Sequence, residues 1–166
     1  GFTNPPDKQL GRNDFSKIPN GAPGIEDRMM VMWEHGVNSG RFDAHRFVEL
    51  TSANPARLFN LWPKKGTIAV GSDADIVIWD PDKTRTISKN THHQNIDFNI
   101  YEGMEVTGNA AITLSRGMVV WENGVVRTER GRGRYVPRPC GAPFWDAQRR
   151  KNAAAVQTPV TRTLPG

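Results

Sequence analysis

The segment TSANPARLFNLWPKKGTIAVGSDADIVIWD, from Thr51 to Asp80, brings two kinds of secondary structure together within thirty residues. A helix is expected to start at Asn54-Pro55, because a proline at the first helical position has no N–H to leave unpaired. A Lys65-Gly66 turn and two short runs of β-branched residues follow it. The segment therefore predicts a junction at which a helical region is followed by a β-sheet.

The residues before this junction predict a long loop and then helices. Prolines and glycines from Gly1 to Ala22 exclude a regular element of any length, since proline fixes φ and lacks an N–H donor. From Ile25 to Trp33 apolar residues recur at helical spacing, with Glu26 and Asp27 in the first turn, where the helix dipole favours anions. Gly36 is expected to end this helix. Asp43 is expected to cap a second helix, separate from the one at Asn54-Pro55.

The residues after Gly66 predict short strands bounded by turns. Asn123-Gly124 lies between two apolar runs and indicates a tight hairpin, because both turn positions must tolerate positive φ. The expected strands are Thr67 to Val70, Ile76 to Trp79, Arg85 to Ile87, Ala111 to Leu114, Met118 to Trp121 and Val125 to Val126. These strands are too few and too short for an independent sandwich, so we expect strands from elsewhere to complete the sheet.

The positive charge is concentrated in the last forty residues. Residues 1–126 hold 13 Lys and Arg against 15 Asp and Glu, whereas residues 127–166 hold 9 against 2. This tail has few large apolar residues and a possible helix from Ala147 to Val156, so we expect it to order only along another subunit. Phe144 and Trp145 are aromatic anchors of the kind that is enriched at interfaces.

The tail also permits a nucleic-acid hypothesis. Arg130, Arg132 and Arg134 alternate with glycines and could neutralise phosphates. Only Tyr135 is near enough to stack on a base, which is little for a single-strand binder. We therefore expect no nucleic-acid partner.

Composition bounds the cellular setting. The single cysteine, Cys140, cannot form an internal disulfide or a zinc cluster. No apolar run approaches the roughly 18 residues that span a bilayer, and the chain shows no signal-peptide pattern. The sequence opens on Gly1 rather than a methionine. We expect a cytoplasmic protein, without a membrane partner, that is truncated at its start.

Several short motifs resemble the hydantoinase/dihydropyrimidinase family of cyclic amidohydrolases, over about Gly1 to Val136. The motifs that resemble cyclic amidohydrolases in general are Asn54-Pro55-Ala56, Lys65-Gly66-Thr67-Ile68, Gly71-Ser72-Asp73-Ala74-Asp75 and Asp80-Pro81. Those that resemble dihydropyrimidinases in particular are Phe15-Ser16-Lys17-Ile18-Pro19-Asn20-Gly21, Thr91-His92-His93-Gln94 and Tyr101-Glu102-Gly103-Met104.

The resemblance implies an α/β fold with three parts. Residues 1–65, a loop plus helices, are implied to end a TIM-barrel amidohydrolase domain, residues 66–136 to form part of a small β-sandwich domain, and residues 137–166 to be an extended tail. The strands that complete the sheet are implied to come from the amino-terminal end of the full-length chain. The full-length protein is implied to be a homotetramer that uses two zinc ions to open the ring of dihydropyrimidines or hydantoins, in pyrimidine catabolism.

No cluster of metal-ligating residues is evident in the sequence. His92-His93 is the only histidine pair, and adjacent side chains on an extended segment point to opposite faces. In the resembled family the ligands lie on earlier barrel strands, and the last catalytic Asp stands in an Asp-His-Cys motif that aligns directly before Gly1. We therefore expect no catalytic residue and no metal ligand in this chain.

One substrate-binding residue is implied to remain. Dihydropyrimidinases hold the ring amide of the substrate through backbone groups of the Asn in Ile-Pro-Asn-Gly, which is Asn20 in this sequence. A flanking N–H and C=O suit an imide, which alternates donors and acceptors.

A non-enzymatic alternative stays open. Collapsin-response-mediator-like scaffolds share the fold and assemble into tetramers without hydrolysis. They tend to carry Glu where this chain has Asn20, and they lack the His92-His93 pair, so both positions favour the enzyme.

Overall fold

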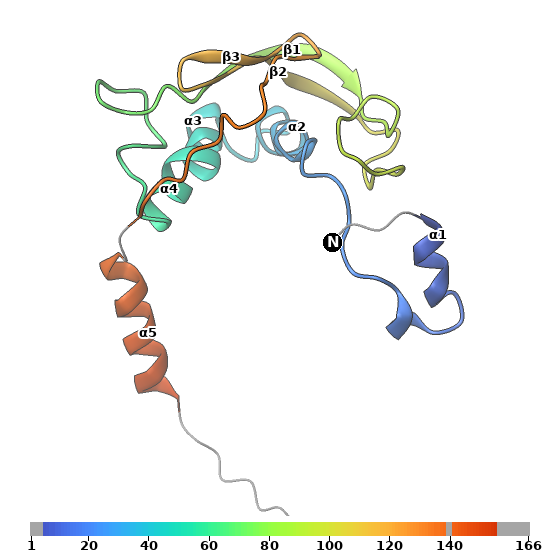
Figure 1. Ribbon diagram of the computed structural model, residues 1–166, viewed down its shortest axis with the longest axis horizontal. Coiled ribbons are helices and arrows are strands. Elements are labelled where there is room, and N and C mark those ends of the chain that lie inside the picture. Colours follow the sequence, from blue (N-terminus) through green and yellow to red (C-terminus); the bar gives the residue numbers. More distant parts are fainter. Residues whose placement is uncertain (1–4, 139–140, 156–166) are drawn as a thin grey trace, which may run out of the picture.

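The computed structural model describes residues 5–138 and 141–155, in which a four-stranded sheet lies over a row of helices (Figure 1). The helical elements are α1 (Pro5–Lys8), 3-10 turns at Gln9–Gly11 and Phe15–Lys17, α2 (Arg28–Met32), α3 (Ala44–Val48), α4 (Asn54–Leu58) and α5 (Ala142–Ala154). The strands are β1 (Ile76–Thr86), β2 (Glu105–Ser115), β3 (Met118–Glu122) and β4 (Val125–Val126). Mixed α/β architecture, as expected from the sequence, is therefore present.

The first predicted helix does not end at Gly36. After α2 the chain continues as a π-helix from Trp33 to Asn38, and Gly36 is buried inside it. A β-carbon at Gly36 would lie 2.0 Å from Cζ of Phe42. This glycine is thus explained by the close approach of an aromatic ring rather than by helix termination.

The two predicted helices between Asp43 and Leu58 are one continuous helical segment. Asp43 is its N-cap, with its carboxylate accepting the backbone N–H of Arg46, which confirms the predicted cap. A π-helical stretch from Glu49 to Ala53 joins α3 to α4. An α-helix does begin at Asn54-Pro55, as predicted, with the proline in its first turn. It is not separate from the preceding helix, because the wider π-helical turn runs directly into it.

The loop at the start of the chain is less irregular than its prolines suggest. The short α1 helix and the two 3-10 turns occupy part of it. Asp14 stabilises the second turn by accepting hydrogen bonds from the backbone N–H and the hydroxyl of Ser16. Each of these elements is at most four residues long, but the expectation that this stretch holds no regular element of any length is wrong for residues 5–17.

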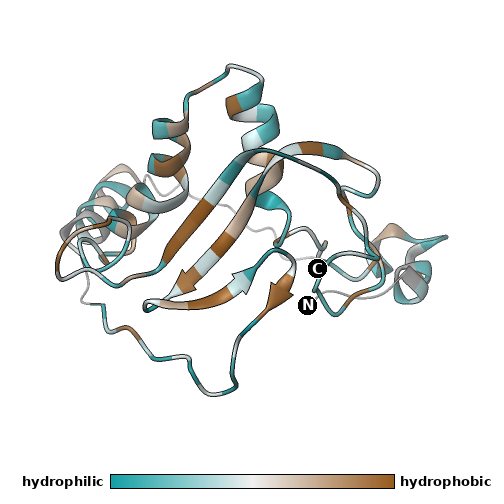
Figure 2. Ribbon diagram, turned by 90° about the horizontal axis from the view of Figure 1, so that it is seen from above, coloured by the Kyte–Doolittle hydropathy of each residue, from teal (hydrophilic) through white to brown (hydrophobic). Residues whose placement is uncertain are grey.

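The sheet is an antiparallel meander in the order β1-β2-β3-β4 (Figure 2). β1 joins two predicted strands into one, because Asp80-Pro81 falls at an irregularity in the β1–β2 ladder instead of a break. The predicted strand from Thr67 to Val70 is wrong. Its residues form turns, the backbone N–H of Ser72 bonds to the carbonyl of Ala69, and Ile68 and Val70 are exposed.

Two other local predictions have clear outcomes. The Asn123-Gly124 hairpin is confirmed, since these two residues connect β3 to β4 with positive φ at both. The tail helix α5 starts at Ala142, earlier than the predicted Ala147, with Gly141 as its N-cap and a proline in the first turn. Val156, where the predicted helix ended, and Cys140 lie outside the described residues.

The core lies between the sheet and the helices. Met30 of α2 packs against Ile87, the residue after β1, and against Val106 of β2. The rings of Trp33, Phe47 and Trp79 form an aromatic cluster beside it, with centroids 5.1–5.7 Å apart. Within residues 5–138 and 141–155, every helix is too short or too polar to cross a membrane.

Candidate functional site

Asn20 lies in a loop, residues 19–24, between the second 3-10 turn and α2. Its side chain is exposed. Gly21 and Gly24, which follow it in the same loop, have φ of 99° and 133°. Only glycine adopts such angles without strain. The sequence therefore fixes an unusual backbone path around the residue that was predicted to bind substrate, and we call residues 19–24 the Asn20 loop.

The end of the Asn20 loop is held by close packing. Gly24 is buried, and a β-carbon there would lie 2.9 Å from Cε2 of Tyr101 and 3.1 Å from side-chain carbons of Ile100. Its backbone N–H donates to Oε1 of Gln94 at 3.2 Å. These contacts come from the segment Ser88 to Met104, which we call the anchor segment. It contacts the loop although it lies about seventy residues later in the sequence.

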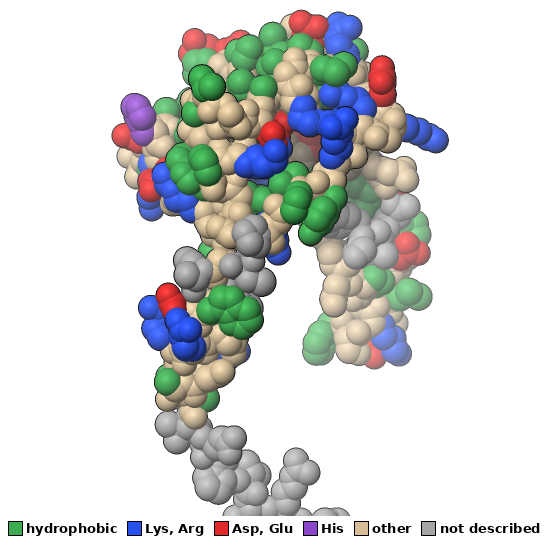
Figure 3. Space-filling view, turned by 60° about the vertical axis from the view of Figure 1, so that its left-hand side comes forward, with side chains coloured by type: hydrophobic (Ala, Val, Ile, Leu, Met, Phe, Trp, Pro, Cys, Tyr) green, Lys and Arg blue, Asp and Glu red, His purple; other side chains and the backbone are tan. Residues whose placement is uncertain are grey.

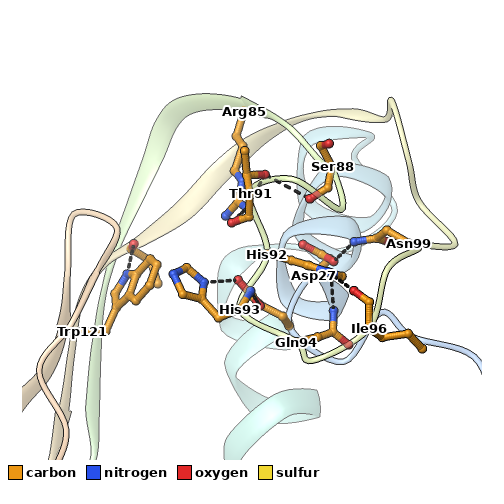
Figure 4. A network of polar contacts seen from close by, with 12 residues as sticks. Asp27, Arg85, Ser88, Thr91, His92, His93, Gln94, Ile96, Asn99 and Trp121 are labelled. Carbon is orange, nitrogen blue, oxygen red and sulfur yellow. Dashed lines mark hydrogen bonds and ion pairs between the residues drawn. The ribbon is translucent and has the colours of Figure 1, made fainter. Parts of the chain in front are cut away.

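A second contact joins the anchor segment to the residue pair that follows the loop. Glu26 accepts the backbone N–H of His93 at 2.6 Å, and its other oxygen lies 3.0 Å from Nδ1 of the same histidine. The His93 ring also packs edge-on against Trp121 of β3, with centroids 5.0 Å apart (Figure 4). His93 therefore connects the loop exit to the sheet.

A third contact is fully buried. Asp27 has no exposed surface, and its Oδ2 accepts from Nδ2 of Asn99 at 2.6 Å. Oδ1 of Asn99 in turn accepts the backbone N–H of Tyr101 at 2.9 Å. A buried polar group needs such a partner, because leaving it without a hydrogen bond is costly. From the sequence, Glu26 and Asp27 were expected to interact with the dipole at a helix start. In the structure their carboxylates instead form hydrogen bonds with His93 and Asn99.

The anchor segment is itself closed by Glu102. Its carboxylate accepts the backbone N–H of Lys89 at 2.7 Å and the hydroxyl of Ser88 at 2.8 Å. The Lys89 N–H and then the Ser88 hydroxyl lower the pKa of Glu102. Backbone bonds between Ile87 and residues 103 and 104 complete this closure.

The two histidines of the pair do not converge on one point. His92 faces the carbonyl of Ile96 through Nε2 and Gln94 through Nδ1, while His93 faces Glu26. Across residues 5–138 and 141–155, no three His, Cys, Asp or Glu side chains group so as to hold a metal ion. The described residues therefore do not fit a zinc centre, and the pair serves to hold backbone in place.

A second polar cluster lies at the helix-to-sheet junction. Lys65 contacts Asp73 at 2.8 Å and also pairs with Asp75, and Lys64 lies 3.2 Å from Asp73. Partial burial acts to lower the pKa of Lys65, but the two carboxylates more than offset it and the pKa is raised. Hydrogen bonds from Lys65 and then Lys64 lower the pKa of Asp73. This cluster fastens the loop between α4 and β1.

Sequence reasoning missed the structural roles of Gln94, Asn99 and Glu26. Gln94 belongs to a motif that resembles dihydropyrimidinases, but the motif alone does not show which backbone group the Gln94 amide contacts. All three contacts join residues about seventy positions apart. One signal was available in the sequence, since polar residues concentrate between two strands where a short turn would suffice to connect them.

Comparison with known proteins gives a consistent family. The sequence model of the Amidohydrolase family matches residues 19–120. Dihydropyrimidinase of Rattus norvegicus is 54% identical over 93% of this chain, which covers 30% of the rat protein. The crystal structure of dihydropyrimidinase from Brevibacillus agri has 52% identity and a TM-score of 0.79, over 82% of this chain and 30% of that one. Human dihydropyrimidinase-related protein 5 is 52% identical over 78% of this chain, and 23% of its own length is covered.

Proposed function

Because the chain belongs to the amidohydrolase family, we propose that it is the carboxy-terminal part of a dihydropyrimidinase-like hydrolase that opens the ring of dihydropyrimidines or hydantoins. The chain spans about a third of the curated relatives it matches, so the activity concerns the whole protein that carries it. Its similarity to a dihydropyrimidinase and to solved D-hydantoinases supports this substrate class. The corresponding role in the cell is pyrimidine catabolism in the cytoplasm.

The proposed architecture has three parts. Residues 1–65 form the end of a TIM-barrel domain, residues 66–136 form part of a β-sandwich, and residues 137–166 form a tail. The interpretation that the sheet is incomplete is supported by its two edges. The outer backbone groups of β1 and of the short β4 pair with no other strand in the described residues. Strands from the amino-terminal part of the whole protein would complete it.

The contribution of this chain to the reaction is to bind the ring. In the Asn20 loop, backbone N–H and C=O groups alternate and can match the donors and acceptors of a cyclic imide. The observation that carries this role is the triple attachment of the loop exit, at Gly24, Glu26 and Asp27, to one anchor segment. A binding backbone must be held rigidly, because it has no side-chain rotamers with which to adapt.

In the proposed whole enzyme, two zinc ions held upstream of this chain would provide a nucleophile, because metal coordination lowers the pKa of a bound water to about 7. The described residues do not fit that centre, so no step through the metal is assigned to this chain. The ligands are proposed to lie upstream of it, in the barrel.

A ring-opening assay tests the proposal. The whole protein, purified with its metal, should hydrolyse dihydrouracil or hydantoin, and the 166-residue chain alone should show neither turnover nor tightly held zinc after dialysis. A whole protein that assembles but hydrolyses neither ring would instead support the scaffold alternative, which the similarity to a dihydropyrimidinase-related protein keeps in view.

A further inference from the structure

Three hydrogen bonds form a chain between the Asn20 loop and Ile96, each donated in the direction from Gly24 toward the carbonyl of Ile96. Nε2 of His92 lies 2.9 Å from the carbonyl oxygen of Ile96, and Nδ1 of His92 lies 3.2 Å from Nε2 of Gln94. Oε1 of Gln94 lies 3.2 Å from the backbone nitrogen of Gly24. Figure 4 shows the side chains of His92 and Gln94 beside Ile96, under α2.

The chemistry of the two ends fixes every proton between them. A carbonyl oxygen only accepts, so His92 must carry its proton on Nε2. A backbone N–H only donates, so the carbonyl end of the Gln94 amide must face Gly24, and its amino end must face His92. Nδ1 of His92 is then the acceptor that this amino group needs. All three contacts are made only when His92 is neutral.

Gln94 has no freedom to turn over in this arrangement. A flipped amide would place its amino group against the N–H of Gly24 and its oxygen against Nδ1 of His92, which would lose both contacts. The N–H of Gly24 and Nδ1 of His92 therefore favour the same orientation of the amide that holds the loop. Without the imidazole acceptor, Gly24 still favours this orientation, but the amino end of the amide loses its partner.

We propose that His92 and Gln94 are positioning residues for substrate binding, which act by holding Gly24 and thereby the backbone of the Asn20 loop. The inference rests on the proposed function for its link to substrate, but the attachment of the loop is measurable without any substrate. Neither residue touches the ring in this proposal, so each should affect binding of substrate more than the chemical step.

The test uses the whole protein, three test variants and one control variant. Gln94→Met keeps the length of the side chain but removes both hydrogen-bonding ends. His92→Phe removes the acceptor for Gln94, whereas His92→Asn retains one, since the amide oxygen of asparagine can stand near the place of Nδ1. Gln148→Met makes the same chemical change as the first variant on the exposed face of α5, where Gln148 contacts Asn152, and serves as the control.

Hydrogen–deuterium exchange of residues 19–27 reports on the attachment. Gln94→Met should exchange there roughly five to ten times faster than wild type, the factor expected for loss of one hydrogen bond. His92→Phe should exchange faster than wild type but more slowly than Gln94→Met, because it removes the support of the Gln94 amide and leaves its bond to Gly24 possible. His92→Asn and Gln148→Met should stay within about twofold of wild type. Unchanged exchange in Gln94→Met, or equal exchange in the two His92 variants, would overturn the inference.

Steady-state kinetics then separate this inference from the proposed function. With dihydrouracil as the substrate, Gln94→Met should raise KM about tenfold while kcat changes less than threefold, a split that follows from weaker ring binding. Faster exchange with unchanged KM would uphold the attachment of the loop and sink its role in substrate binding. Two results together would support both the attachment of the loop and its role in substrate binding. The first is faster exchange in Gln94→Met with a matching rise in KM, and the second is slower exchange in His92→Asn than in His92→Phe.

Discussion

Gly66 lies directly against Ala56, so closely that a β-carbon added to the glycine would stand 2.5 Å from Cβ of Ala56 and 2.8 Å from the carbonyl oxygen of Ser52. Gly66 has φ of 83°, and Ala56 is buried. Two motifs that are separate in the sequence, Asn54-Pro55-Ala56 and Lys65-Gly66, are therefore the two sides of one contact. The loop that leads from α4 toward β1 can pass this close to the helix because both residues are small.

Gly66→Ala should destabilise the protein by about 2–4 kcal/mol, since it combines backbone strain with overpacking against a helix. Gly71→Ala is the matched control, because Gly71 also has positive φ, at 90°, but its β-carbon would meet open space. That control should cost about 1 kcal/mol. The free energies come from urea denaturation, and equal losses in the two variants would show that the contact with Ala56 is unimportant.

Lys65→Met should make stability less dependent on acid pH. Hydrogen bonds from Lys65 and Lys64 hold the pKa of Asp73 below its usual 3.8, so this stabilisation is complete above that value and is lost as pH falls through the folded-state pKa. At pH 7 the variant should be less stable than wild type, and the gap should shrink below about pH 4.

Unfolding curves from pH 7 to pH 2.5 measure that gap. Lys151→Met, on the exposed surface of α5, is the control and should show no gap at any pH. A gap between wild type and Lys65→Met that stays constant down to pH 2.5 would show that Lys65 contributes by packing instead of by charge.

Substitutions in the Asn20 loop should rank by their effect on backbone. Asn20→Ala should change kcat/KM of the whole enzyme by less than about threefold, because the proposed contact uses main-chain atoms. Gly21→Pro should raise KM at least tenfold, since Gly21 has φ of 99° and proline requires about −65°. Kinetics with dihydrouracil decide the order, and a larger effect of Asn20→Ala would assign the contact to the side chain.

We propose that the whole protein is a homotetramer which the tail helps to assemble, so removal of residues 137–166 should shift it from tetramer toward dimer. In Figures 1 and 3, α5 extends away from the rest of the chain, and Trp145 is about half exposed. Such a helix gains stability chiefly by packing on something else. Arg138 of this tail stacks 5.3 Å over the ring of Phe59 in its own chain.

Light scattering of the truncated protein checks the assembly, with metal content measured alongside and expected to stay unchanged. Trp145→Ala should reproduce part of the shift. If the truncated protein remains a tetramer, the tail has no role in assembly.

Short-range features were predictable from the sequence. The cap at Asp43 and the Asn123-Gly124 hairpin depend on residues within three positions of each other, and both were predicted correctly. The family could also be predicted from the sequence, because its motifs are short runs of adjacent residues with characteristic residue types. The role of Asn20 remains a prediction, since its test requires the ring to be bound.

The errors arose where distant residues decide the outcome. Val70 has the composition of a strand but no neighbouring strand to pair with in the described residues, so turn-forming contacts around Gly71 prevail. Gly36 resembles a helix terminator, yet it is buried against Phe42 within a π-helix.

The sequence by itself determined the family, the helix-to-sheet order and the glycines of the Asn20 loop, because local dihedral preferences and turn chemistry act between near neighbours. Only the tertiary structure brought Gly24, Glu26 and Asp27 against residues 93–99. That attachment depends on the register of a sheet whose strands lie on either side of the anchor segment, and no local preference encodes a hydrogen bond across seventy residues.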